Sequence, residues 1–124
     1  MKPKMLLAIL LLAGCAAPPP GVDQQGPPLE LAGRVAGAPT ACVPLRQGES
    51  LRVSENNDHT LIYGNGRTMF ANYLGQCRID RDDLLVTLPS AGSYCRGDVV
   101  KTVDRSSGLP GSACILGNFV PYTL

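Results

Sequence analysis

Four cysteines constrain this chain more than any other feature, because the domain that contains them is small. They are Cys42, Cys77, Cys95 and Cys114, all within residues 41–124. A domain of this length buries little apolar surface, so its core alone gives only marginal stability. An even number of cysteines in such a small domain predicts two disulfides if its compartment is oxidising.

A zinc site is the alternative for these four thiols. Zinc favours closely spaced pairs such as Cys-x-x-Cys. Here successive cysteines are separated by 35, 18 and 19 residues, and His59 is the only histidine. The spacing therefore favours disulfides over a metal.

Loop-closure entropy does not choose between the possible cysteine pairings. Pairing Cys42 with Cys114 and Cys77 with Cys95 gives about 7–8 kcal/mol relative to the unfolded chain, and pairing neighbours along the sequence gives about 7 kcal/mol. We predict the first arrangement, because it would tie the two ends of the domain together and protect both terminal strands.

A fifth cysteine, Cys15, ends a short apolar segment at the N-terminus. Lys2 and Lys4 precede the uncharged residues 5–12, which is the layout of a secretory signal. This run is far shorter than the roughly 20 residues of a membrane-spanning helix. A buried core helix is a poor alternative, because the run leads into the proline-rich residues 16–21, which cannot continue a helix.

The end of this segment resembles the bacterial lipobox. Its four residues are Leu12, Ala13, Gly14 and Cys15. The resemblance implies that residues 1–14 are removed and that Cys15 carries a diacylglycerol on its thiol and an acyl chain such as palmitate on its amino group. Two or more such chains give a stable membrane anchor. Ala16 stands where the family's signal for inner-membrane retention has aspartate, so the resemblance implies the periplasmic face of the outer membrane.

Charge and proline content divide the mature chain into a tether and one domain. Without residues 1–14, nine basic and ten acidic side chains remain, which does not predict nucleic-acid binding. Lys101 is then the only lysine, so no basic membrane patch is expected. Residues 15–40 contain six prolines and four glycines and predict a disordered linker, with at most a weak contact from residues 29–35. Residues 41–124 are expected to form the domain.

Short apolar segments separated by turn residues predict strands in this domain. Apolar and polar residues alternate at the start of it, as in half-buried strands, and Gly-Asn-Gly at 64–66 predicts a hairpin. The expected strands lie at residues 51–53, 59–63, 67–74 and 84–88 and within 96–103 and 113–124. The sequence thus predicts an all-β domain of six or seven short strands, in a small antiparallel barrel or sandwich.

Three short stretches suggest chemistry but are better explained as structure. Arg-Gly-Asp at 96–98 matches an integrin-binding tripeptide, yet Gly-Asp before a valine-rich strand is ordinary turn chemistry. A calcium loop starting at Asp80 fails, because leucine stands at the glycine position and alanine at the final glutamate position. Asp58 and His59 are adjacent, and neighbours on a strand point to opposite faces. We therefore predict no enzymatic activity, no metal site and no cofactor.

The aromatic side chains are expected mostly in the core of a domain that has no tryptophan. They are Tyr63, Phe70, Tyr73, Tyr94, Phe119 and Tyr122. Of these, Tyr73 and Tyr94 would anchor a partner if they were exposed.

The cysteine order, together with Gly97 and Asp98 in a turn, is similar to a family of small four-cysteine proteobacterial proteins. These proteins are secreted or lipid-anchored, and their function is unknown. The resemblance covers residues 42–120. It implies a small disulfide-linked β domain but does not imply any biochemical activity.

Two functions remain open. The first is a structural or protein-interaction module of the cell envelope, held to the membrane by its lipid and binding another envelope component. The alternative is a periplasmic inhibitor of a lysozyme-like or other hydrolase, acting through the loop at 104–113. An exposed apolar patch would favour the interaction role, and a protruding, ordered loop would favour the inhibitor. We predict the interaction module.

Overall fold

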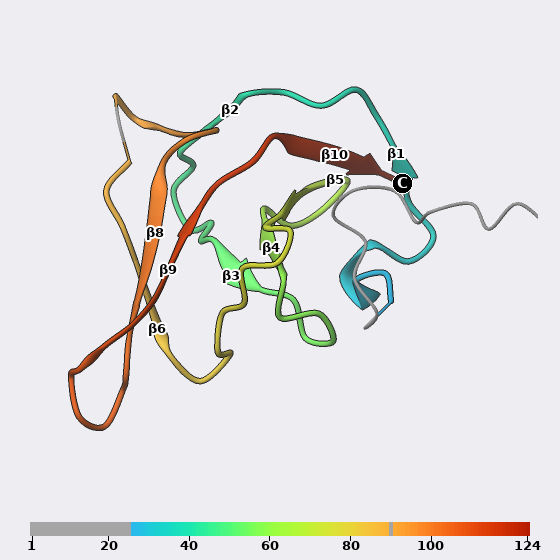
Figure 1. Cartoon of the computed structure of the whole chain (residues 1–124). Coiled ribbons are helices and arrows are strands. Elements are labelled where there is room, and N and C mark those ends of the chain that lie inside the picture. Colours follow the sequence, from blue (N-terminus) through green and yellow to red (C-terminus); the bar gives the residue numbers. More distant parts are fainter. Residues whose placement is uncertain (1–25, 90) are drawn as a thin grey trace, which may run out of the picture.

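The domain is built from β-strands. The computed structural model describes residues 26–89 and 91–124, which form ten strands and one short 3-10 helix, with no α-helix among them (Figure 1). All strand pairs are antiparallel. The three sheets have a sandwich-like arrangement, and the described residues close no barrel. The all-β prediction is confirmed, whereas six or seven strands is too few, because three strands of two or three residues leave no pattern in the sequence.

The largest sheet has the strand order β1-β10-β5-β4-β3. Its strands are β1 (Val35–Ala36), β3 (Arg52–Val53), β4 (Thr60–Tyr63), β5 (Thr68–Tyr73) and β10 (Phe119–Thr123). Gly64 and Gly66 have positive φ angles of 88° and 84° between β4 and β5, which confirms the predicted hairpin. Every residue of β4 is buried, so both faces of this sheet are covered.

Two apolar clusters cover these faces. Leu61 and Tyr63 of β4 belong to the larger cluster, which also contains Val100 of another sheet. Ile62 belongs to the smaller cluster, together with Leu31 from the N-terminal segment. Successive side chains of a strand point to opposite faces, so β4 contributes to both cores.

The two smaller sheets pack against the larger cluster. One pairs β2 (Cys42–Pro44) with β7 (Ser93–Cys95), and the other joins β6 (Leu84–Thr87), β8 (Val99–Val103) and β9 (Pro110–Ile115) in the order β6-β8-β9. Leu85, Val100 and Cys114 face inward and contact this cluster. In Figure 1 the three strands stand together on the left of the molecule. The loop predicted at 104–113 is shorter than expected, because β9 begins at Pro110.

All four domain cysteines form disulfides, but not in the predicted pairs. Cys42 is bonded to Cys95, and Cys77 is bonded to Cys114. The predicted bonds between Cys42 and Cys114 and between Cys77 and Cys95 are therefore wrong. Tying the two ends of the domain together, the reason for the prediction, is therefore not what decides which thiols meet.

Strand register decides the first bond. Cys42 of β2 lies directly opposite Cys95 of β7. In the adjacent pair, the Arg96 N–H donates to the Ala41 carbonyl at 2.7 Å. Because hydrogen-bonded and non-hydrogen-bonded pairs alternate, the two cysteines occupy a non-hydrogen-bonded pair, where opposite side chains are closest.

The N-terminal segment from residue 26 belongs to the folded domain. η1 (Leu29–Leu31) places Leu31 in the smaller cluster with 7% of its surface exposed. β1 then extends the large sheet by pairing with β10. A linker over the whole of residues 15–40 and a domain boundary at residue 41 are therefore wrong. Residues 1–25, with Cys15 and the predicted signal peptide, lie outside the described residues.

Polar side chains of the 54–57 turn hold this segment in place. Asn56 Nδ2 donates to the Pro27 carbonyl at 2.9 Å, and Asn57 Nδ2 donates to the Gly26 carbonyl at 2.8 Å. The Glu30 carboxylate accepts from Ser54 Oγ at 2.8 Å and from the Glu55 N–H at 2.7 Å. A turn that is merely polar in the sequence thus supplies partners to a proline-rich backbone, which no local pattern predicts.

Candidate functional site

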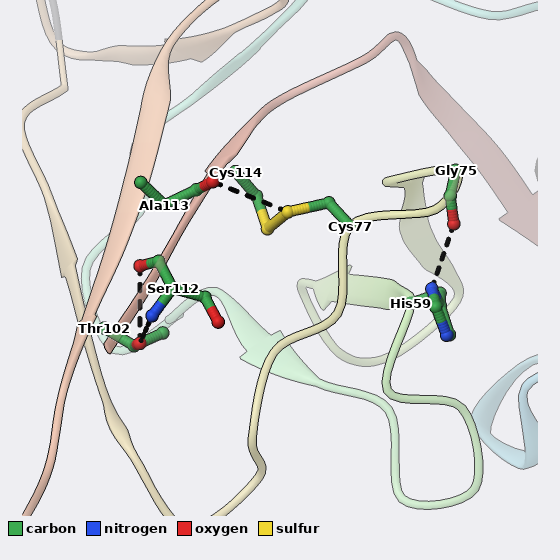
Figure 2. Close-up of a disulfide and its surroundings, with 7 residues drawn as sticks. All are labelled: His59, Gly75, Cys77, Thr102, Ser112, Ala113 and Cys114. Atoms are coloured by element: carbon green, nitrogen blue, oxygen red, sulfur yellow. Dashed lines mark hydrogen bonds between the residues drawn. A yellow bond between two sulfur atoms is a disulfide. The ribbon is translucent and has the colours of Figure 1, made fainter.

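Asp58 and His59 lie in the turn before β4. They do not occupy a strand, so the expectation that they point to opposite faces is wrong: His59 Nε2 lies 3.5 Å from Asp58 Oδ1. The Asp58 carboxylate also accepts from Arg78 Nε, and His59 Nδ1 lies 3.0 Å from the Gly75 carbonyl (Figure 2). These contacts fasten the connection between β5 and β6 to the turn, which is a structural role.

The same connection carries the Cys77–Cys114 disulfide. Figure 2 shows that the bond joins this connection to β9, where the Cys77 sulfur also lies 3.5 Å from the Ala113 carbonyl oxygen. On the far side of β9, the Ser112 N–H donates to Thr102 Oγ1 at 2.7 Å. The disulfide therefore links the β6-β8-β9 sheet to the end of β5.

The Arg-Gly-Asp stretch is a turn, as the sequence indicates. Asp98 Oδ2 accepts from the Cys95 N–H at 2.8 Å, and the Asp98 N–H donates to the Cys95 carbonyl at 3.1 Å. Gly97 has a φ of 92°. The aspartate is thus committed to hydrogen bonds within the turn.

The acidic turn at residues 80–83 is also held by local contacts. Asp80 Oδ1 accepts from the Asp82 N–H at 2.9 Å. Across residues 26–89 and 91–124, no cluster of three or more histidine, cysteine, aspartate or glutamate side chains could hold a metal ion.

The two tyrosines considered as partner anchors occupy different environments. Tyr94 is only 9% exposed and packs edge-on against Tyr63, with ring centroids 5.4 Å apart, so it is a core residue. Tyr73 is partly buried, and its hydroxyl bonds that of Tyr122. Burial and this hydrogen bond raise the pKa of the Tyr73 hydroxyl. The rings of Tyr73 and Tyr122 line a pocket of about 290 Å³, together with residues of the N-terminal segment.

An exposed apolar surface lies on one side of the β6-β8-β9 sheet. We call it the outer face, and it consists of Leu84 and Val86 of β6, Val99 and Lys101 of β8, and Ala113 and Ile115 of β9. Ile115 is 66% exposed, and Val99, Val86 and Leu84 are 46%, 44% and 42% exposed. The opposite face of the same sheet carries the core residues. This small sheet is therefore apolar on both sides.

Lys101 lies at the centre of the outer face. It is exposed and stands between Val86 of β6 and Ala113 of β9 in the strand register. A pocket of about 360 Å³ lies beside it, bordered by Val86, Val103 and Ala113 among others. Among the described residues, no acidic side chain pairs with this ammonium group.

A signal for the outer face is present in the sequence. Leu84 and Leu85 are consecutive, and so are Val99 and Val100. Consecutive apolar residues in a strand indicate that both faces of the sheet are apolar. The pattern alone does not say which face the core covers.

The β8-β9 connection, residues 104–109, extends beyond the strands at the lower left of Figure 1. Asp104 Oδ1 organises it by accepting four hydrogen bonds: from Ser106 Oγ at 2.7 Å, the Ser106 N–H at 2.9 Å, the Ser107 N–H at 2.8 Å and Ser107 Oγ at 3.0 Å. Arg105 Nε donates to the Asp82 carbonyl at 2.9 Å. The loop is therefore both protruding and internally braced.

We expect Asp104 to titrate with a pKa of about 2, below the ordinary 3.8, because the Ser106 hydroxyl and then the Ser107 N–H donate to its charged form. The folded-state pKa is the lower one, so the stabilising effect of the carboxylate is complete at neutral pH and is lost as the pH falls through about 4 toward 2. Carboxyl-carbon NMR titration measures the midpoint. Ser106→Ala should move it upward, and a wild-type midpoint at the ordinary value would contradict the bracing.

In comparisons with known proteins, no protein-family model, curated protein or solved structure matches the chain. The resemblance to four-cysteine envelope proteins stays a prediction. In the part of the chain that the structure describes, no helix has the length and hydropathy of a membrane span.

Proposed function

We propose that the chain is a lipid-anchored protein of the cell envelope that acts as a structural or protein-interaction module and not as an enzyme. Cys15, at the end of the lipobox-like segment, would carry the lipid at the periplasmic face of the outer membrane. Residues 16–25 would then separate the lipid from the folded segment.

The observation that supports an interaction role is the outer face. Exposed apolar patches of this kind mark interaction sites in soluble domains. Four of its six residues are large aliphatic side chains that are more than two-fifths exposed, which is costly unless a partner covers them. The outer face is therefore the part of the domain best suited to bind another protein.

Lys101 defines the chemistry of that partner. Covering the outer face would take its ammonium group out of water, and an unpaired buried charge opposes binding. The partner we propose is a folded envelope protein with an apolar contact surface that bears a carboxylate opposite Lys101. Such charge pairs mainly supply specificity at interfaces.

Site-specific photo-cross-linking in intact cells tests this proposal. A photoreactive amino acid in place of Ile115 should form a discrete adduct, whereas the same group at the exposed Asn65, in the β4-β5 turn, should not. The captured protein counts as the partner only if Lys101→Glu lowers the adduct yield and a lysine in place of the captured carboxylate restores it. An adduct that is indifferent to Lys101→Glu contradicts the proposed partner chemistry.

The same membrane preparation tests the anchor. Intact-mass analysis should find a chain that begins at Cys15 and carries the mass of its acyl groups. A mature chain that retains residues 1–14, or a Cys15 without lipid, would contradict the anchored location.

The braced loop at 104–109 supports a second candidate, the inhibition of a lysozyme-like or other hydrolase. Inhibitors of this kind insert an ordered loop into an active-site cleft, and Asp104 holds this loop in one conformation through its four hydrogen bonds. Leu109, which is 65% exposed, would then lead the insertion. A photoreactive group at Leu109 that captures a hydrolase, with none captured at Ile115, would favour the inhibitor over the interaction module.

A further inference from the structure

Strand β6 forms an open edge of the β6-β8-β9 sheet. It pairs with β8 and, among the described residues, with no other strand. On the other edge of the sheet, β9 is tied to the β5-β6 connection by the Cys77–Cys114 disulfide. The two edges therefore differ: at the β9 edge the Cys77 sulfur lies 3.5 Å from the Ala113 carbonyl oxygen, whereas no disulfide crosses the β6 edge among the described residues.

The hydrogen bonds of β8 show which backbone groups of this sheet face each neighbour. The Leu116 N–H donates to the Asp98 carbonyl at 2.9 Å, and the Asp104 N–H donates to the Leu109 carbonyl at 2.9 Å. Hydrogen-bonding direction alternates along a strand. The backbone N–H and carbonyl groups of the even-numbered residues of β8 thus point toward β9. Those of its odd-numbered residues point toward β6.

The same alternation continues in β6. Lys101 of β8 lies opposite Val86, so the N–H and carbonyl of Val86 point toward β8. Those of Leu85 and Thr87 then point away from β8, to the edge of the sheet. Unpaired N–H and carbonyl groups in such a row are a template for pairing with another chain.

Nothing in the sequence of this edge protects it. Residues 84–88 read Leu-Leu-Val-Thr-Leu, without a charge or a proline until Pro89. Natural edge strands are usually blunted by such residues. Leu84 and Val86 are partly exposed, and Leu88 is 85% exposed. The edge therefore combines open backbone groups with apolar side chains.

We propose that β6 pairs antiparallel with β6 of a second copy of this chain, about a twofold axis at Val86. Leu85 of each copy lies opposite Thr87 of the other, and these two pairs exchange backbone hydrogen bonds. Val86 faces Val86, and Leu84 faces Leu88, at non-hydrogen-bonded positions, where side chains approach most closely. The two three-stranded sheets become one six-stranded sheet with a continuous outer face.

Charge placement favours a second copy at this edge. In the antiparallel arrangement, the acidic turn at 80–83 of each copy lies at an opposite end of the ribbon, beside the uncharged Pro89, Ala91 and Gly92 of the other. Packing two outer faces against each other would instead bring two Lys101 ammonium groups together, which is unfavourable. A twofold contact through one strand is also isologous, so it closes at the dimer.

A cysteine in place of Val86 tests the register. The chain already shows that two cysteines at a non-hydrogen-bonded antiparallel pair form a disulfide, at Cys42 and Cys95. The full-length protein, purified from membranes in mild detergent as Val86→Cys, should form a reducible dimer, and peptide mapping should locate the bond at position 86. Val99→Cys, an exposed control on the same face but away from the axis, should give several-fold less dimer. Equal cross-linking of the two variants, or more from Val99→Cys, would overturn the proposal.

A second variant tests the backbone pairing without a new thiol. Thr87→Pro removes an N–H that points to the open edge, so it costs the monomer no ladder hydrogen bond, and proline is tolerated in edge strands. Light scattering should show the loss of the dimer for Thr87→Pro and its retention for Thr87→Val. A dimer that survives Thr87→Pro, or a wild type that is monomeric throughout, contradicts the pairing; if Thr87→Pro does not fold, the Val86→Cys comparison decides.

This inference does not depend on the proposed function. Ile115 lies on β9, away from the proposed twofold axis, so photo-cross-linking there reports on the envelope partner. A monomeric protein that still forms the Ile115 adduct would overturn the dimer alone. A dimer without that adduct would overturn the interaction module alone.

Discussion

Replacing Cys77 and Cys114 together by alanine is expected to lower the free energy of unfolding by about 4 kcal/mol, from the entropy of closing the loop between them. Their sequence separation is 37 residues. Cys114 is 2% exposed in the larger apolar cluster, so the variant also loses contacts at the centre of the domain. Urea denaturation under non-reducing conditions measures the change. The β6-β8-β9 sheet should be most affected, because this bond fastens β9 to the rest of the fold.

The other disulfide provides the matched control. The bond between Cys42 and Cys95 closes a segment with a separation of 53 residues, so its loop-closure entropy is similar. Because Cys42 is exposed, replacing this pair by alanine removes less buried contact. We therefore expect the Cys42 and Cys95 variant to lose less free energy of unfolding than the Cys77 and Cys114 variant. If the Cys77 and Cys114 variant lost less, burial of its sulfur atoms would contribute nothing to stability.

The second large effect is expected from Asn72→Ala, with a loss of about 2–4 kcal/mol. Asn72 is fully buried in β5. Its Nδ2 donates to the Gly117 carbonyl at 2.8 Å, and its Oδ1 accepts from the Gly117 N–H at 2.8 Å. Alanine would leave both backbone groups without these partners. Thermal or urea unfolding measures the change.

Gly117 explains why this contact matters to the architecture. It lies in the connection from β9 to β10, which passes from the small sheet to the large one. A Cβ at this position would meet the Tyr73 carbonyl at 3.3 Å, so the backbone approaches β5 closely. Asn72 therefore holds the connection between the two sheets in place.

Two variants separate the hydrogen bonds of Asn72 from simple removal of an amide. Asn72→Asp keeps an acceptor for the Gly117 N–H but loses the donor to its carbonyl, so it should also destabilise the domain. Asn118→Ala removes a neighbouring, exposed asparagine and should change stability by no more than about 0.5 kcal/mol. Equal effects of Asn72→Ala and Asn118→Ala would contradict the proposed role of Asn72.

Local patterns predicted most of the longer strands. The strands at residues 59–63, 67–74 and 84–88 correspond to β4, β5 and β6, because alternation and the glycines at 64 and 66 act over a few residues. The strands β1, β2 and β7, each of three residues or fewer, escaped prediction. The equally short β3 was expected at residues 51–53, because apolar and polar residues alternate there.

The outer face and the open edge were only partly predictable. Paired apolar residues in β6 and β8 show that both sides of this sheet are apolar, but only the packing of Leu85 and Val100 into the core reveals which side remains exposed. The backbone groups of Leu85 and Thr87 point to an open edge because β6 is the outermost strand of its sheet. Strand order is a property of the whole fold, so it has no local signal.

The all-β class, the β4-β5 hairpin and the commitment of four cysteines to disulfides were predictable, because each depends on residue type and short-range spacing. Which cysteines meet depends on the complete fold, since strand register places Cys42 opposite Cys95. The fold also makes the chain from residue 26 part of the domain, because Asn56 and Asn57, some 30 residues away, bond the carbonyls of Pro27 and Gly26. Contacts between distant segments form only when the whole chain is folded, and no local pattern records them.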